Sequence, residues 1–114
     1  MLDPISGNLE SYLTLVSARQ RLVASNIANA DTPGYKTKDI DFDTELQNSI
    51  AGMTVAPEAV TGLITKNDGN NVDLDREARL LAENALRFTV ASNLIRSKLK
   101  LLKMAIEGGS SSSS

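Results

Sequence analysis

The sequence predicts an all-α fold in which two long helices, one at each end of the chain, pair as an antiparallel coiled coil. A long irregular middle segment joins them. In both terminal parts, apolar residues recur at alternating steps of four and three, which places them on one seam of an α-helix. Between about residues 32 and 71 no helical period persists. Only 4% of residues are aromatic, so a thick globular core is not expected.

The first helix is predicted over about Ser6 to Ala30. Its seam, with one polar exception at Gln20, consists of Leu9, Leu13, Val16, Gln20, Val23, Ile27 and Ala30. Pro33 disfavours helical backbone at the residue before it. Pro33-Gly34 suits the central pair of a type II turn, in which glycine accepts a positive φ. The helix is therefore expected to end near Ala30 or Asp31.

The middle segment, residues 32–71, is predicted to be an irregular linker with one short extended stretch. Ile40 and Phe42 alternate with aspartates, which is strand-like over a very short length. Leu46 and Ile50 suit a single helical turn, and residues 67–71 form a strong turn cluster. A connection of roughly 40 residues is longer than compact domains usually contain. It is expected to be mobile when free or ordered by partners.

The second helix is predicted over about Leu74 to Glu107, with Asp73 as its N-cap. Gly108-Gly109 is expected to end it, and residues 110–114 read as a low-complexity disordered tail. Residues 1–31 and 72–109 would form one paired helical domain. The seam of this helix consists of Leu74, Ala78, Leu81, Ala85, Phe88, Ser92, Ile95, Leu99, Leu102 and Ile106.

The two helices differ in length, at roughly 37 Å for the first and 50 Å for the second. Part of the second seam would stay uncovered in an isolated molecule. Exposed leucine and isoleucine side chains on that overhang favour self-assembly or docking on a partner.

The composition excludes several classes of function. The net charge is −2, with 12 basic and 14 acidic residues, so nothing favours nucleic acid or an anionic membrane as a partner. The chain has no cysteine and no histidine, which removes thiolate chemistry and the usual metal ligand and general base. No apolar run is long enough to span a bilayer. The sequence predicts no enzyme activity, no cofactor and no metal site.

Residues 25–36 read SNIANADTPGYK directly after the first helix. This segment resembles the signature of bacterial flagellar basal-body rod proteins. Residues 39–42, 68–77 and 82–88 are similar to the proximal members of that family. The likeness covers both ends of the chain, whereas residues 45–66 are short and match nothing in the family.

The resemblance implies a structural subunit that polymerises through its terminal helices into the proximal rod, the torque-transmitting drive shaft around the export channel. Its implied partners are copies of itself, other flagellar rod proteins, the adapter protein at the rod base and the flagellar type III export apparatus. Its implied location is the periplasmic rod, reached without a cleaved signal peptide. A soluble coiled-coil adapter or export chaperone of the same secretion system remains the alternative.

We expect the partner contacts to come from the two seams and from the turn between them. The predicted contact residues are Leu13, Val16, Val23, Asn26, Ile27, Asn29, Asp31, Pro33, Gly34, Tyr35, Leu81, Phe88, Ile95, Leu99 and Leu102. Two simpler interpretations stay open. The polar members suit ordinary capping of a helix end, and the heptads suit the core of a simple helical hairpin.

Overall fold

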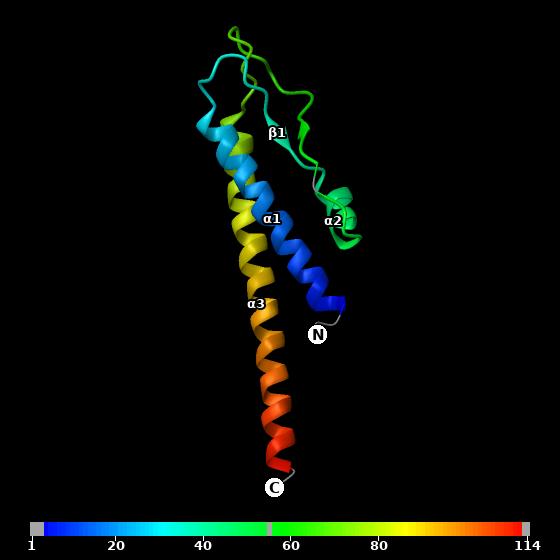
Figure 1. The fold of residues 1–114 in the computed structure, drawn as a ribbon. Coiled ribbons are helices and arrows are strands. Elements are labelled where there is room, and N and C mark those ends of the chain that lie inside the picture. Colours follow the sequence, from blue (N-terminus) through cyan, green and yellow to red (C-terminus); the bar gives the residue numbers. More distant parts are fainter. Residues whose placement is uncertain (1–3, 55, 113–114) are drawn as a thin grey trace.

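The computed structural model describes residues 4–54 and 56–112, with the side chains of residues 7–54 and 56–108. Its elements are α1 (Pro4–Ala28), β1 (Lys38–Asp39), α2 (Phe42–Ile50), β2 (Glu58–Ala59) and α3 (Leu74–Ser112). Helices α1 and α3 run antiparallel and lie side by side near the loop end of the molecule, and α3 continues far beyond the start of α1 (Figure 1). The molecule measures 74 × 25 × 17 Å. The predicted all-α fold with paired terminal helices is confirmed.

Helix α1 ends at Ala28, two residues before the predicted limit, and the chain then turns as predicted. The backbone N–H of Tyr35 donates to the carbonyl of Thr32 at 3.2 Å, which closes the turn around Pro33-Gly34. Gly34 has a φ of 75°, the positive value that the second central residue of a type II turn requires. The prediction of this turn type from the Pro-Gly pair is confirmed.

The middle segment packs against α1. Ile40 and Phe42 are buried against Leu15 and Val16 of α1. The ring of Tyr12 meets that of Phe42 edge to face, with 5.4 Å between the ring centroids. The connection is therefore ordered by α1 itself, whereas the sequence predicted either mobility or ordering by partners.

Of the two short elements predicted in the middle segment, the helical one is present, whereas the extended one is displaced from the residues that predicted it, because the strand covers Lys38–Asp39, Ile40 follows it and Phe42 begins α2. β1 pairs antiparallel with β2, with Lys38 opposite Ala59 and Asp39 opposite Glu58. The single helical turn expected around Leu46 is the longer helix α2, whose N-cap is Asp41.

Helix α3 begins as predicted and ends later. The side-chain carboxylate of Asp73 accepts from the backbone N–H groups of Asp75 and Arg76 at 3.1 and 3.2 Å, so its role as N-cap is confirmed. The prediction that Gly108-Gly109 ends the helix is wrong, because α3 continues to Ser112. Each glycine costs only about 1 kcal/mol, and lengthening an existing helix needs no new nucleus. Residues 113 and 114 of the predicted tail lie outside the described residues.

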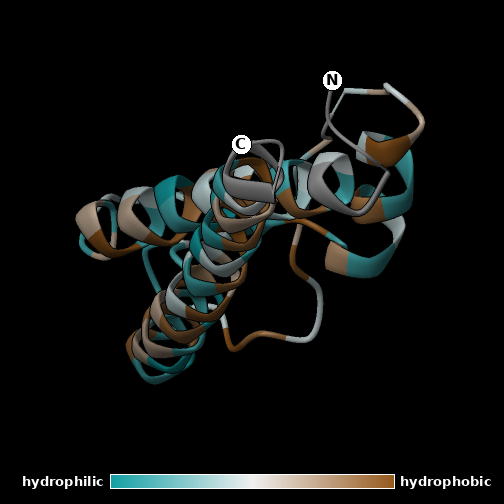
Figure 2. Ribbon diagram, turned by 90° about the horizontal axis from the view of Figure 1, so that it is seen from below, coloured by the Kyte–Doolittle hydropathy of each residue, from teal (hydrophilic) through white to brown (hydrophobic). Residues whose placement is uncertain are grey.

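The face of α3 that meets α1 is not the predicted seam. The fully buried side chains of α3 are Glu77, Asn84 and Ala91, which are spaced by seven residues. At 100° per residue this row lies roughly 60° around the helix from the row of Leu74, Leu81 and Phe88. Hydrophobic segments recur along the whole α3 ribbon, including the part that extends past α1 (Figure 2). The apolar stripe of α3 is therefore displaced to the side of its contact with α1.

Candidate assembly interface

Asn26 joins α1, the chain before β1 and the start of α3. Its side chain is completely buried. The amide nitrogen donates to the carbonyl of Lys38 at 2.8 Å and to the carboxylate of Glu77. The amide oxygen accepts from the hydroxyl of Tyr35 at 2.9 Å and from the backbone N–H of Lys38 at 3.2 Å. Since every polar atom of Asn26 is paired inside the chain, Asn26 and Tyr35 act first as structural residues of the subunit.

Asp39 is the centre of an ion cluster between α1 and α3. The guanidinium of Arg19 binds its two carboxylate oxygens in a bidentate arrangement at 3.0 Å each. Arg76 of α3 also binds Asp39, and its other nitrogen reaches the Glu77 carboxylate at 3.1 Å. Two cations and two carboxylates thus neutralise one another where α1, β1 and α3 meet.

The surroundings shift the pKa of these two carboxyl groups in opposite directions. Burial acts to raise the pKa of Asp39, but the hydrogen bonds and charge of Arg19, the backbone N–H of Ile40 and a hydrogen bond from Arg76 outweigh it and lower the pKa. Burial raises the pKa of Glu77, and the hydrogen bond from Asn26 and the charge of Arg76 only partly offset this. The folded structure therefore favours an ionised Asp39 and disfavours an ionised Glu77.

Asn70 and Asn71 hold the turn cluster against the end of α1. The Asn70 amide nitrogen donates to the carbonyls of Asn29 and Thr32, both at 2.8 Å. Its oxygen accepts from the backbone N–H of Val72 at 2.9 Å, and the oxygen of Asn71 accepts from the N–H of Thr37 at 2.7 Å. Asn29 and Thr32 lie in the turn that follows α1, so these bonds tie that turn and Thr37 to the chain just before α3.

Two glycines bring the turns of residues 32–35 and 66–69 into close contact. The N–H of Gly34 donates to the carbonyl of Asp68 at 2.8 Å. A Cβ at Gly69 would lie 3.3 Å from the Cα of Gly34, and Gly69 has a φ of 84°. A side chain at Gly69 would therefore crowd the backbone of Gly34 and require the two turns to move slightly apart. We call Asn26, Asp39, Asn70, Asn71 and Glu77, with these turns, the polar cluster.

The predicted contact residues of the first half divide into buried and exposed groups. Val16 and Val23 are buried, and Leu13 is half-buried. Asn29 is bound within its own turn, because its amide donates to the carbonyl of Ser25 and its oxygen accepts from Thr32. The residues that reach the surface are Ile27, Asp31, Pro33 and Gly34.

The predicted contact residues of α3 lie largely on the surface. The exposed fraction is 39% for Leu81, 47% for Phe88, 54% for Leu99 and 50% for Leu102, and Ile95 is half-buried. From Leu99 to Gly108 every side chain is exposed. In the isolated subunit these apolar side chains are only partly covered, which is the arrangement expected of an interaction surface.

A groove of about 500 Å³ runs between α1 and α3, beside the exposed stripe of α3. Val16, Gln20 and Ala24 of α1 line one wall, and Asn84, Ala85 and Phe88 of α3 line the other. Asn84 is buried, yet neither polar atom of its side chain has a hydrogen-bond partner, and the Gln20 side-chain oxygen is likewise unpaired.

Sequence reasoning missed Asn84, Arg19, Asp39, Arg76 and Glu77. The spacing of seven residues from Glu77 to Asn84 to Ala91 is the one signal that could have indicated a second row facing α1. The charged residues of the cluster come from distant segments and carry no local pattern.

Among the described residues, no three or more acidic side chains are grouped in a way that could hold a metal ion. Within residues 4–54 and 56–112, no helix is both long and apolar enough to cross a membrane.

A family model and comparison with individual proteins both indicate the same family. Residues 9–36 match the family model described as flagella basal body rod protein. The chain is 34% identical to the flagellar basal body rod protein FlgB of Salmonella typhimurium, over 96% of this chain and 99% of that protein. It is 31% identical to FlgB of Escherichia coli, with the same coverage. It is 30% identical to FlgB of Yersinia ruckeri, over 96% of this chain and all of that protein.

Proposed function

The chain belongs to the FlgB family of flagellar basal body rod proteins and is a structural subunit of the flagellar rod, and from that premise we propose that it polymerises through its two terminal helices. The observation that carries the proposal is the uncovered apolar stripe of α3. Four of its members, Leu81, Phe88, Leu99 and Leu102, are each between 39% and 54% exposed. A stripe of this length on a lone soluble helix is unfavourable in water, and burial against neighbouring subunits removes that cost.

The groove between α1 and α3 extends the same surface. Its walls carry the predicted contact residues Val16 and Phe88 and the unpaired amide of Asn84. A helix of a neighbouring subunit lying along the groove would cover Phe88 and Ala85 together. We include the groove and the exposed stripe in one assembly surface.

The finer parts of the proposal rest on the resemblance to rod proteins. The subunit would lie in the proximal rod in the periplasm, with its terminal helices forming the inner layer around the export channel. It would reach that place through the flagellar type III export apparatus without cleavage of a signal peptide. Its neighbours would be copies of itself, other rod proteins and the adapter protein at the rod base.

The proposal is tested by adding a charge to the exposed stripe. In separate variants, Leu81→Asp and Leu102→Asp place a carboxylate where burial in a polymer would be costly. Both side chains are exposed in the isolated subunit, so helix content and thermal stability are expected to stay within about 0.5 kcal/mol of the wild type. In the cell, both variants are expected to be exported, to be missing from isolated basal bodies and to abolish swimming.

The matched control is Asn93→Asp, which adds the same charge to an exposed position of α3 without removing an apolar side chain. This variant is expected to swim normally. Normal swimming of both leucine variants would refute assembly through the stripe. Secretion assays separate a failure of assembly from a failure of export.

A further inference from the structure

The face of α3 that meets α1 is polar at its centre, whereas the apolar row beside it is left in water. Asn84 is 1% exposed, and neither polar atom of its side chain has a hydrogen-bond partner. Phe88 and Leu81, on the neighbouring row, are 47% and 39% exposed. Burying an unpaired amide and exposing large apolar side chains both raise the free energy of the subunit. Hydrophobicity alone therefore favours a different rotation of α3.

A turn of α3 about its own axis would exchange the two rows, which lie roughly 60° apart. The groove of about 500 Å³ between α1 and α3 is lined by Phe88 and Asn84 and, on the α1 side, by Val16, Gln20 and Ala24. The turn would carry Phe88 from the wall of the groove onto α1. It would bring Asn84 to the rim, where water can pair its amide. The groove thus supplies the space that the Phe88 ring needs.

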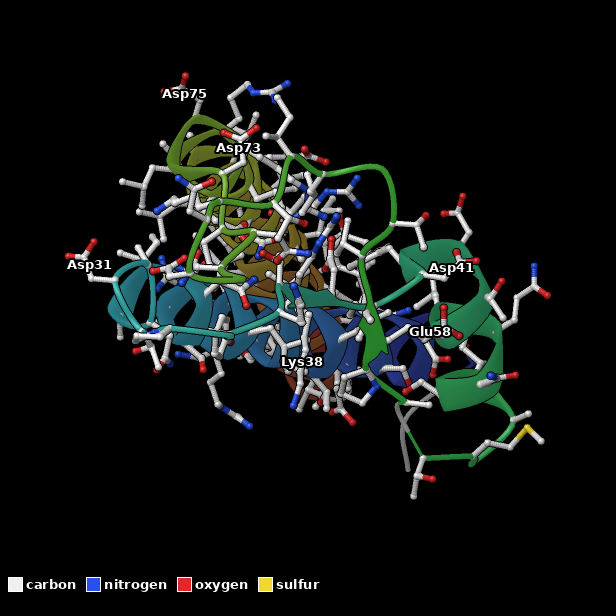
Figure 3. The ribbon with its side chains drawn as sticks, turned by 90° about the horizontal axis from the view of Figure 1, so that it is seen from above. Asp31, Lys38, Asp41, Glu58, Asp73 and Asp75 are labelled. Carbon is white, nitrogen blue, oxygen red and sulfur yellow. The ribbon has the colours of Figure 1, made fainter. Side chains whose placement is uncertain are left out.

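Contacts at two levels of α3 oppose this turn, and the first lies at the start of the helix. Glu77 accepts a hydrogen bond from the buried amide of Asn26, and the guanidinium of Arg76 is bound to the carboxylate of Asp39. Figure 3 looks onto this end of the molecule, where Asp73 marks the start of α3. These bonds fix the direction in which the first turn of α3 faces.

Arg87 makes the second contact, further along α3. Its guanidinium lies over the ring of Phe42, 4.5 Å from the ring centroid, and one of its nitrogens donates to the hydroxyl of Tyr12 at 3.4 Å. A guanidinium over an aromatic face is attracted to it. Since Arg87 precedes Phe88 directly, a turn that carried Phe88 toward α1 would pull Arg87 off the Phe42 ring. We call the three side chains that hold α3 in this rotation the latch: Arg76, Glu77 and Arg87.

We propose that the latch keeps the apolar stripe of α3 facing outward, and that a subunit without it turns α3 and buries Leu81 and Phe88 against its own α1. The turned state is an autoinhibited form of the subunit, because it closes the groove and hides part of the stripe from neighbouring subunits. That consequence rests on the proposed function. The turn itself is a property of the isolated chain.

The chain contains no tryptophan, so a single introduced tryptophan reports on the rotation of α3. The reporter is Phe88→Trp in the purified chain, read by its emission wavelength and by acrylamide quenching. Adding Glu77→Ala is expected to shift the emission to shorter wavelength and to lower the quenching, because the indole leaves water. Unfolding would change both in the opposite direction. None of these readouts depends on assembly, so they succeed or fail independently of the proposed function.

Two matched variants serve as controls. Glu77→Gln keeps the oxygen that accepts from Asn26 and is expected to leave the emission of the Phe88→Trp reporter unchanged. Leu86→Trp, used in place of Phe88→Trp, puts the indole on the side of α3 away from Asn84. Leu86 is 66% exposed, and a turn of roughly 60° leaves this side in water. The emission of that second reporter is expected to be the same with and without Glu77→Ala.

Asn84→Leu supplies the reverse test. An apolar side chain at this position removes the unpaired amide, so the rotation with this row on α1 no longer conflicts with hydrophobicity. Adding Asn84→Leu to Glu77→Ala is therefore expected to return the Phe88→Trp reporter to the emission of the intact latch. Emission that stays at the shorter wavelength would show that Asn84 does not drive the turn, and would overturn the proposal.

The proposal also fails if the Phe88→Trp emission in Glu77→Ala stays unchanged or moves to longer wavelength while circular dichroism shows intact helices. Arg87→Ala releases the latch at its second contact, where the side chain is 32% exposed, and is expected to give the same shift to shorter wavelength. Loss of helix in both variants would overturn the proposal as well, because no turned state would then be stable without the latch.

Discussion

The polar cluster and the basic overhang of α3 (residues 96–108) differ in which side chains they bury and which they expose to solvent. Asn26, Asn70 and Glu77 are completely or almost completely buried, and each is hydrogen-bonded within the chain. In the overhang, Leu102, Met104 and Ile106 are at least half exposed. The polar side chains thus find their partners inside the subunit, whereas the apolar side chains do not.

This contrast separates two steps of folding. Contacts within the polar cluster join residues 26–39 to residues 66–77, so this end has a defined structure before any partner arrives. From Leu99 to Gly108 every side chain of the overhang is exposed, and the ion pair of Lys103 with Glu107 lies within the helix itself. Isolated helices of this length are marginal in water. The subunit therefore arrives at the rod with one end formed and with the other end dependent on its neighbours.

The largest expected effect comes from breaking the ion cluster. Asp39→Asn leaves Arg19 without its bidentate partner and removes one of the two carboxylates that face Arg76. Because a partly buried charge loses its counter-ion, we expect a loss of about 3 kcal/mol in the free energy of unfolding. Urea denaturation followed by circular dichroism measures it. Asp43→Asn, at an exposed position of α2, is the control and is expected to be neutral.

The next effect compares two buried asparagines. Asn70 makes three side-chain hydrogen bonds, whereas Asn84 makes none. Asn70→Ala leaves the buried N–H of Val72 without its acceptor and removes one of the two hydrogen bonds at each of the Asn29 and Thr32 carbonyls, so we expect a loss of about 2 kcal/mol. Asn84→Leu removes unpaired polar atoms and is expected to raise stability by about 1 kcal/mol. If Asn84→Leu destabilises the isolated chain as much as Asn70→Ala does, the conclusion that Asn70 stabilises the fold and Asn84 does not is wrong.

The features of the structure that the sequence could predict are those formed by residues close together in the chain. The turn at Pro33-Gly34 and the cap at Asp73 follow from residues within four positions of one another, and both predictions were correct. The heptad spacing correctly predicted that α1 and α3 pair. It did not predict which face of α3 meets α1, because the spacing identifies only the apolar face of the helix, whereas the face that meets α1 carries Glu77 and Asn84.

The rotation of α3 is set by a contact between residues far apart in the sequence. Asn26 binds Glu77 across 51 positions, and Arg19 and Arg76 converge on Asp39. No local pattern links these residues. Their hydrogen bonds turn the row of Glu77, Asn84 and Ala91 toward α1, and the apolar stripe is thereby left for other subunits.

A smaller effect is expected from the close contact of the two turns. Gly69 and Gly52 have the same φ of 84°, but only at Gly69 would a Cβ meet another backbone, at 3.3 Å. Gly69→Ala and Gly52→Ala therefore carry the same conformational strain of about 1 kcal/mol. The Gly69 variant is expected to lose more stability than the Gly52 variant, and thermal melts compare them. Equal losses would show that the turns can separate without cost.

The smallest expected effect is a change in the pH dependence of stability, and it distinguishes the two carboxyls of the polar cluster. Folding lowers the pKa of Asp39 below its usual 3.8, so its contribution is present above that pH and is lost as the pH falls. Folding raises the pKa of Glu77 above its usual 4.5, so its contribution is present below that pH and is lost as the pH rises through the higher, folded-state value.

Glu77→Gln keeps an oxygen that accepts from Asn26 but cannot ionise. Relative to the wild type, this variant is therefore expected to become more stable as the pH rises from 4 to 7, whereas Asp39→Asn is expected to become less stable as the pH rises from 3 to 5. Urea titrations at these pH values measure both differences. A constant difference between Glu77→Gln and the wild type would mean that Glu77 is ionised as readily in the folded chain as in the unfolded one. The hydrogen bond from Asn26 and the charge of Arg76 would then offset the whole cost of burying the Glu77 charge, instead of only part of it.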